Sequence, residues 1–145
     1  MKLTTKVRYS LRFMIDLALH VEGATVLARD ISRRQEISEK YIGHFVPLLK
    51  SAGLIRASRG ARGGFSLARP ASEITLKDIV EAVEGPMCLV GCVNDPGICK
   101  RAGTCQARDV WGEATRAIAD IFSRYNLEKM AEEQRSRHTD YVYAI

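Results

Sequence analysis

Apolar residues recur at helical spacing near the start of the chain. Val7, Leu11 and Met14 lie on one face of a 3.6-residue repeat. This spacing predicts an amphipathic helix over residues 6–22, and Gly23 is a typical residue to end it. Arg8 and Arg12 are one turn apart on the polar face of this helix.

Two shorter helical patterns follow. One covers residues 27–35, and the next begins after Ser38, a favoured N-cap residue, and runs to about Ala52. Two short helices joined by a tight turn form a helix-turn-helix pattern, in which the second is the recognition helix. Its apolar stripe includes Tyr41 and Phe45. Its predicted outer face carries four residues: Glu39, Lys40, Gly43 and His44.

An alternating apolar pattern comes next, at residues 54–58 and again at 65–68. The segment between them, residues 59–64, is rich in Gly and Arg, so the sequence predicts a β-hairpin. A hairpin directly after a helix-turn-helix is a wing. Arg59 and Arg62 supply charge for DNA phosphates or the minor groove, and Gly60 permits a close approach of the backbone.

Helical spacing returns in the second half of the chain. Thr75 and Asp78 form a capping-box pattern at the start of a helix that ends at Gly85. A longer helix follows Cys105, and a short one is predicted over residues 127–137, before a tail at 138–145 with no predicted structure. The longer helix carries an apolar stripe with 3, 4, 3, 4 spacing, which is typical of helix pairing and predicts a homodimer: Trp111, Ala114, Ile118, Ile121 and Tyr125.

Charge divides the 145-residue chain into two halves. Residues 1–70 hold 13 Lys and Arg against 5 Asp and Glu, whereas residues 71–145 hold 9 against 12. A basic first half is expected of a nucleic-acid-binding module. With 46% hydrophobic residues, no apolar run of membrane-spanning length and no signal-peptide pattern, we expect a cytoplasmic protein with no membrane partner.

All four cysteines fall in one segment rich in Gly and Pro, with the spacing Cys88-x3-Cys92-x6-Cys99-x5-Cys105. Disulfides do not suit a cytoplasmic chain. Zinc sites usually pair cysteines as C-x2-C, and this segment has no such pair. An iron–sulfur cluster accepts thiolates from several points of an irregular loop, so the spacing favours a cluster, with zinc or a thiol-based redox switch as the alternatives.

Catalysis has little support in the sequence. The three histidines, His20, His44 and His138, are far apart, and no recognisable arrangement of nucleophile and base accompanies them. A redox enzyme would also need a second cofactor or substrate site, for which the chain has little length. We therefore expect a protein that is not an enzyme.

The assembled motifs resemble the family of iron–sulfur winged-helix regulators that includes the cluster assembly repressor IscR and the nitric-oxide-sensing repressor NsrR. The likeness covers nearly the whole length, and its most specific part is the wing motif Arg59-Gly60-x-x-Gly63-Gly64-Phe65 together with the cysteine triplet. It implies a homodimeric repressor whose operator binding is tuned by a cluster held by Cys92, Cys99 and Cys105.

The fourth cluster ligand departs from the family pattern. Arg108 stands where the assembly-repressor type has histidine, and Arg8 stands where the nitric-oxide-sensing type has aspartate. Cys88 can complete an all-thiolate site, and Asp109 or a residue of a partner subunit are the alternatives. We expect a 2Fe–2S cluster rather than 4Fe–4S. The signal, whether iron, redox state or nitric oxide, is left open by the sequence.

The predicted fold is mainly α with a small β-hairpin wing. We expect a winged helix-turn-helix DNA-binding domain over residues 1–85, a cysteine-rich cluster-binding loop over 86–107, and a dimerisation helix with a short C-terminal helix over 108–137. The expected partner is a double-stranded, pseudo-palindromic operator. The residues expected at the DNA are Arg8, Ser38, Lys40, Tyr41, His44, Arg59, Gly60 and Arg62.

Overall fold

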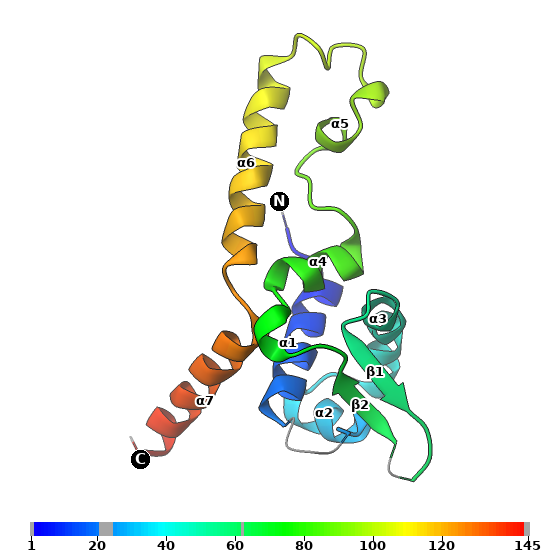
Figure 1. Ribbon diagram of the computed structural model, residues 1–145, viewed down its shortest axis with the longest axis vertical. Coiled ribbons are helices and arrows are strands. Elements are labelled where there is room, and N and C mark those ends of the chain that lie inside the picture. Colours follow the sequence, from blue (N-terminus) through cyan, green and yellow to red (C-terminus); the bar gives the residue numbers. More distant parts are fainter. Residues whose placement is uncertain (1, 21–24, 62, 144–145) are drawn as a thin grey trace.

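A helical body and a narrow extension make up the computed structural model of the chain (Figure 1). It describes residues 2–20, 25–61 and 63–143, the last four of these through their backbone alone. The elements are α1 (Thr5–Leu19), α2 (Ala28–Gln35), α3 (Glu39–Ser51), β1 (Ile55–Ser58), β2 (Gly64–Leu67), η1 (Ala71–Glu73), α4 (Leu76–Glu84), α5 (Gly91–Asn94), η2 (Pro96–Ile98), α6 (Gln106–Ser123) and α7 (Leu127–Tyr143). The mainly helical fold with one hairpin is confirmed.

Helix α1 lies at the centre of the body and contacts α2, α3, α4, α7 and β2. Its side chain Phe13 is fully buried and meets the rings of Phe45 and Phe65 edge-on, with ring centroids 5.4 and 5.5 Å apart. Edge-to-face ring contacts add to the stabilisation from apolar burial. These three aromatic residues therefore join α1, the recognition helix and the wing in one core.

The helix-turn-helix consists of α2 and α3. The turn between them passes through Glu36, which has a left-handed backbone with φ of 54°. Ser38 caps α3, because its hydroxyl accepts a hydrogen bond from the Tyr41 backbone N–H at 3.1 Å. Both the predicted cap and the exposed outer face of α3 are confirmed. The helix continues through Pro47 to Ser51 without interruption.

The wing is the antiparallel pair β1–β2, in which Ile55 is opposite Leu67 and Ser58 is opposite Gly64. Phe65 also exchanges two backbone hydrogen bonds of 2.8 Å with Val26. This pair connects the hairpin to the segment before α2. Gly64 has φ of +152°, and a Cβ there would lie 2.5 Å from the Val26 carbonyl oxygen. Only glycine therefore permits this close approach.

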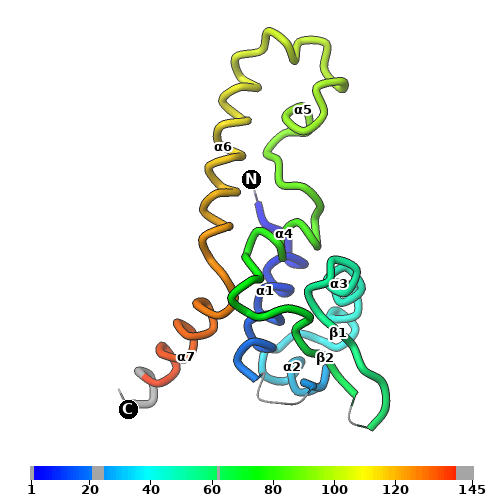
Figure 2. The backbone as a smooth tube through the Cα atoms, viewed as in Figure 1, coloured from blue at the N-terminus to red at the C-terminus, as the bar shows by residue number. Residues whose placement is uncertain are grey.

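The second half begins with α4, whose capping box at Thr75 and Asp78 is present as predicted. Helix α4 packs on α6, and the extension consists of the cysteine segment, which leads away from the body, and α6, which runs back to it (Figure 2). Two backbone hydrogen bonds hold the base of α6 to the start of α4. The Leu76 N–H donates to the Tyr125 carbonyl at 2.8 Å, and the Leu127 N–H donates to the Ile74 carbonyl at 2.9 Å.

Three expectations about the second half of the chain were wrong. Helix α6 ends at Ser123, so Tyr125 lies beyond it. Helix α7 does not stop near residue 137 but continues to Tyr143, because no glycine or proline ends the pattern there. The cysteine segment is not wholly irregular, since it contains the short helices α5 and η2. The first helix was also expected to continue to residue 22, but α1 ends at Leu19 with His20 as its C-cap; residues 22 and 23 themselves lie outside the described residues.

No helix among the described residues is both long enough and apolar enough to cross a membrane.

Candidate DNA-binding surface and cysteine loop

The first half of α3 presents a polar face to solvent. Ser38, Lys40 and His44 are exposed, and Tyr41 is half-buried. The Tyr41 ring packs edge-on against the rings of Tyr9, at 5.2 Å between centroids, and His44, at 5.7 Å. Tyr41 thus links this face to α1 and limits the positions open to the imidazole of His44. An exposed, polar start of a recognition helix is the part that contacts base edges in helix-turn-helix proteins.

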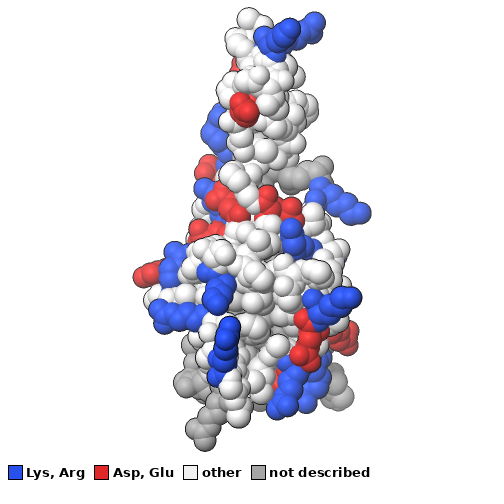
Figure 3. Space-filling model, turned by 90° about the vertical axis from the view of Figure 1, so that its right-hand side faces the viewer, with Lys and Arg blue, Asp and Glu red and all other residues white. Residues whose placement is uncertain are grey.

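The wing presents a second exposed, basic segment. Arg59 and Gly60 are exposed at the end of the hairpin, and Gly60 has a positive φ of 99°. The predicted contact residue Arg62 lies outside the described residues. Arg56 is also exposed on β1, next to the buried Ile55. It was not among the predicted DNA contacts, although alternation along the strand places it opposite the buried side. Figure 3 shows Lys and Arg spread over the part of this face that carries α3 and the wing.

Arg8, the remaining predicted DNA contact, is exposed on α1. Its Nη2 donates a 2.9 Å hydrogen bond to the hydroxyl of Thr5, one turn earlier on the same helix. Arg12 has a different environment: it donates to the Gln35 backbone carbonyl and to that residue's side chain, and its guanidinium lies 5.4 Å from the centre of the Tyr9 ring. Arg12 therefore joins α1 to the end of α2.

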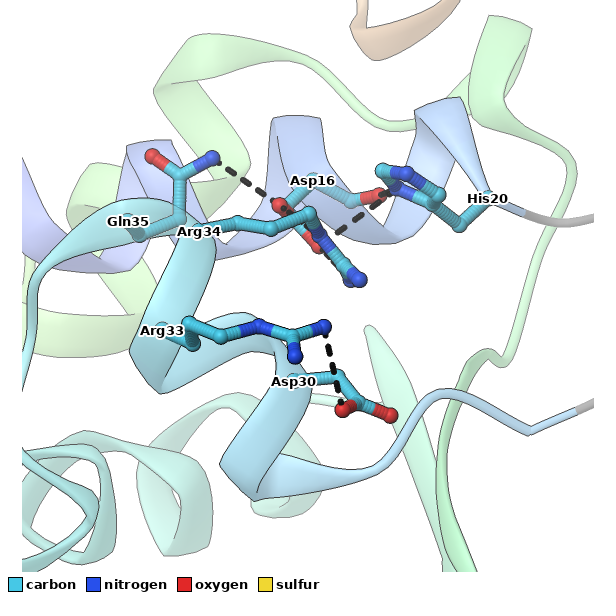
Figure 4. A network of polar contacts seen from close by, with 6 residues as sticks. All are labelled: Asp16, His20, Asp30, Arg33, Arg34 and Gln35. Carbon is cyan, nitrogen blue, oxygen red and sulfur yellow. Dashed lines mark hydrogen bonds and ion pairs between the residues drawn. The ribbon is translucent and has the colours of Figure 1, made fainter.

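A buried carboxylate fixes α2 against α1 (Figure 4). Asp16 is 1% exposed and accepts hydrogen bonds from Arg34 Nε at 3.0 Å, Arg34 Nη2 at 2.6 Å and Gln35 Nε2 at 2.9 Å. The hydrogen bond to Asp16 raises the pKa of Arg34. This network was not predicted from the sequence. The available signal was an acidic residue on the apolar side of a predicted helix, one residue before Leu17.

The four cysteines all lie on the extension as free thiols. Cys88 is exposed, whereas Cys92, Cys99 and Cys105 are half-buried. Cys92 belongs to α5, Cys99 follows η2, and Cys105 is the N-cap residue of α6. The three half-buried cysteines therefore lie in three different local structures, just before the helix that carries the apolar stripe.

Arg108 joins the two ends of this loop. Its Nε donates a 2.8 Å hydrogen bond to the Cys92 carbonyl, and its Nη2 lies 3.5 Å from the Val93 carbonyl. These carbonyls are at the C-terminal end of α5, where no helical donor is available to them. In this arrangement Arg108 caps α5, and its guanidinium is a donor rather than a metal ligand.

The donors of the loop fit an iron–sulfur cluster in their chemistry, because they are soft thiols close together in sequence. Their arrangement does not fit a bound metal centre: among the described residues, no three Cys, His, Asp or Glu side chains are grouped as metal ligands would be. Asp109, the other predicted fourth ligand, is exposed in the first turn of α6. Binding of a cluster therefore requires the loop to close.

The predicted dimerisation stripe is accessible on α6. Trp111 is 44% exposed and Ile121 46%, and Tyr125 just beyond the helix is 42% exposed. Val110, outside the predicted stripe, is 49% exposed. Ala114 and Ile118 are half-buried. Large apolar side chains gathered on one helix in this way are typical of a surface that another protein chain covers.

The helix-turn-helix followed by a two-stranded wing places the chain in the class of winged-helix DNA-binding proteins. The model of the family described as "Rrf2: Iron-dependent Transcriptional regulator" matches residues 3–133. The chain belongs to the Rrf2 family. It is therefore a DNA-binding transcriptional regulator, and its named relatives are regulators rather than enzymes.

Individual relatives agree with this assignment. The chain is 38% identical over 127 residues to the protein named rrf2 of Nitratidesulfovibrio vulgaris, which covers 88% of this chain and 85% of the relative. Its fold is similar to that of CymR, the global cysteine regulator of B. subtilis, with a TM-score of 0.76, 31% identity and coverage of 92% and 98%. It is also similar to IscR of T. potens, with a TM-score of 0.75, 28% identity and coverage of 92% and 88%.

Proposed function

We propose that the chain is a homodimeric repressor that binds a pseudo-palindromic operator through α3 and the wing. The observation that carries the DNA-binding part is the exposed start of α3 beside the exposed Arg59 of the wing. These elements are held together by the Phe13, Phe45 and Phe65 core, so they are presented to DNA as one unit. A two-fold dimer would present two such units about one turn of DNA apart.

Two substitutions separate affinity from specificity. Arg59→Ala removes a wing charge, so we expect weaker binding to operator and to unrelated DNA alike, with a log–log salt slope smaller by about 0.9 for one lost phosphate contact. His44→Ala on the outer face of α3 should alter discrimination between operator variants by about 1–3 kcal/mol for a lost base contact. Binding titrations at several salt concentrations measure both effects.

Arg116→Ala is the matched control for Arg59→Ala, because Arg116 is an exposed arginine on α6, outside α3 and the wing. It should leave both affinity and salt slope unchanged. If Arg59→Ala and His44→Ala have the same effect on every DNA, with no change in salt slope for Arg59→Ala, then α3 and the wing do not dock as proposed.

We further propose that Cys92, Cys99 and Cys105 hold an iron–sulfur cluster, expected to be 2Fe–2S, that modulates operator binding. This is supported by three half-buried free thiols on one loop that leads directly into α6. When bound, a cluster supplies a redox-active centre whose potential depends on its ligands. The chain's own part is to close the loop and to connect it to the start of α6 through Cys105 and Arg108.

Anaerobic purification tests the cluster directly. We expect coloured protein that contains iron and acid-labile sulfide, and we expect each of Cys92→Ser, Cys99→Ser and Cys105→Ser to remove the colour without unfolding the body. Stoichiometric zinc without sulfide would establish the zinc alternative instead. A cluster that persists after any one of these three substitutions would show that the ligand assignment is wrong.

Cys88 is the proposed fourth ligand. If it ligates, Cys88→Ala should make the cluster labile and shift its reduction potential, because ligand changes act directly on the metal centre. An unchanged spectrum and potential would transfer the role to Asp109 or to the partner subunit.

A thiol-based switch is the second candidate function. The observation that favours it is that one short segment carries four free thiols, of which Cys88 is exposed and the other three are half-buried. Such a switch predicts colourless protein whose DNA affinity changes on treatment with hydrogen peroxide and returns with a thiol reductant. Peroxide-independent DNA binding by metal-free protein would exclude it.

A further inference from the structure

One cavity of the molecule lies between α1, α2 and α7. It has a volume of about 680 Å³ and is bounded by α1, the end of α2 and the second half of α7. In Figures 1 and 2, α7 projects from the body on the side away from α3 and the hairpin. Pockets that bind small molecules commonly have volumes of about 300–1,000 Å³, so the space suits a small ligand.

The lining of this cavity is strongly basic. It includes Arg12, Arg34 and Arg135 together with His20 and His138. Among the described residues, the one acidic residue that lines it is Asp16, whose carboxylate is buried and already bonded to Arg34, as Figure 4 shows. Within the described part of the lining, the positive charge that remains is therefore not balanced by acidic groups.

Two of the basic side chains have no hydrogen-bond or ion-pair partner among the described residues. Arg12 and Arg34 are engaged with Gln35 and Asp16, but Arg135 has no side-chain hydrogen bond or ion pair within the part of the chain that the structure describes, and neither does His138. The His20 ring is engaged as well, because its Nδ1 lies 2.8 Å from the Asp16 backbone carbonyl oxygen and 3.5 Å from Asp16 Oδ1. Arg135 and the His138 imidazole are therefore the basic groups of this lining that have no partner among the described residues.

A neighbouring cavity shows that this imbalance is specific to one side of α7. The space of about 460 Å³ between α1, β2, η1 and α7 is also lined by Arg135, but there Arg69 is accompanied by Glu128 and Glu132. Its charges are mixed, whereas the larger cavity combines several cations with one neutralised carboxylate. The larger cavity also offers apolar contact through the half-buried Ile15 and Leu19.

We propose that this cavity is a binding site for a small organic anion that carries a carboxylate or phosphate group. The anionic group would accept hydrogen bonds from Arg135 and the imidazole of His138, and its apolar part would lie against Ile15 and Leu19. Charge-assisted hydrogen bonds of this kind are stronger than neutral ones. None of the residues that line this cavity is a proposed DNA contact or a loop cysteine, so the site does not depend on either proposal above.

Titration of the full chain with defined probes tests the site. The probes are succinate, phenyl phosphate and inorganic phosphate, with uncharged succinamide as the matched neutral compound. The measurement is the NMR shift of the His20 and His138 imidazoles and of the Gln134 side-chain amide. We expect a saturable shift with at least one organic anion and none with succinamide. A response to phenyl phosphate but not succinate, or the reverse, identifies the anionic group.

Arg135→Ala should weaken binding about tenfold or more, as expected for loss of one charge-assisted hydrogen bond. Arg137→Ala is the control, because Arg137 is an exposed arginine on the same helix that does not line the cavity. Equal weakening by the two variants would reduce the effect to general ionic attraction and overturn the proposal. It would also be overturned by unsaturated shifts with every anion, or by duplex DNA producing the same imidazole shifts, which would make the cavity a DNA contact.

Discussion

Removing the guanidinium that neutralises Asp16 is the sharpest test of what holds the helix-turn-helix in place. Arg34→Met keeps most of the apolar stem but leaves a carboxylate that is 1% exposed with Gln35 as its remaining side-chain donor within 3.0 Å. Breaking a buried pair on one side costs about 3–5 kcal/mol. Because Gln35 remains and the Arg34 side chain is 30% exposed, we expect the low end, about 3 kcal/mol.

The matched control is one residue away on the same helix. Arg33 is 78% exposed and lies 3.7 Å from Asp30, which is 34% exposed. An exposed pair three residues apart on a helix contributes about 0.2–0.5 kcal/mol, so Arg33→Met should cost no more than that. Denaturant unfolding at one fixed protein concentration measures both variants, because dimerisation would make the apparent stability depend on concentration.

The melting temperature should follow the same order. For a chain of about 150 residues, 1 kcal/mol corresponds to roughly 2–4 °C, so Arg34→Met should lower it by roughly 6–12 °C. Adding Asp16→Asn to Arg34→Met should recover part of the loss, because the uncompensated charge is then gone. If Arg34→Met and Arg33→Met differ by less than about 0.5 kcal/mol, the buried pair does not hold α2 on α1, and the reasoning is refuted.

The pH dependence of this difference has a definite sign. Asp16 raises the pKa of Arg34 in the folded state, so the stabilisation is fully present below the unfolded-state pKa and is lost only as pH rises through the folded-state value. Both values lie far above neutrality for arginine. The free-energy difference between wild type and Arg34→Met should therefore stay constant between about pH 7 and pH 9.

Three further substitutions test separate parts of the structure. Ser38→Ala removes the cap of α3 and should lower the free energy of unfolding by about 1 kcal/mol in denaturant titrations, and no loss would mean that the cap is replaced by solvent. Gly64→Ala forces a Cβ to within 2.5 Å of the Val26 carbonyl, so hydrogen exchange at the wing should accelerate, whereas unchanged protection would contradict this tight contact. Ile121→Asp on the α6 stripe should shift the protein from dimer to monomer in analytical ultracentrifugation, while Ile98→Asp, at a 63% exposed loop position, should not.

Local sequence signals predicted most of the helical body. Ser38, the Thr75 and Asp78 capping box and the glycine-rich wing depend on neighbouring residues alone, and each was found where the sequence placed it. Contacts between distant segments were not predicted from the sequence. The pairing of Asp16 with Arg34 joins residues 18 positions apart, and no periodicity reveals which of the basic residues on α2 will turn inward.

The candidate sites follow the same division. The exposed face of α3 was predicted from helical spacing, since burial of Phe45 fixes which side of the helix is outside. The cysteine spacing indicated soft ligands but not the conformation of their loop, because a Gly- and Pro-rich segment has few local preferences that select one path. The basic cavity beside α7 was missed because the helix was expected to end near residue 137, which removed His138 from any ordered surface.

Helix α6 holds the cysteine loop at a distance from the helical body. Helix α6 has 18 residues, so the loop at its far end is about 27 Å from the Asn126–Thr75 bridge at its base. A rigid rod of that length turns a displacement of about 1 Å at the tip into a rotation of about 2° at the base. Tightening or opening of the loop around Cys105 would therefore be passed by α6 to its base, where it packs on α4, as a small rotation.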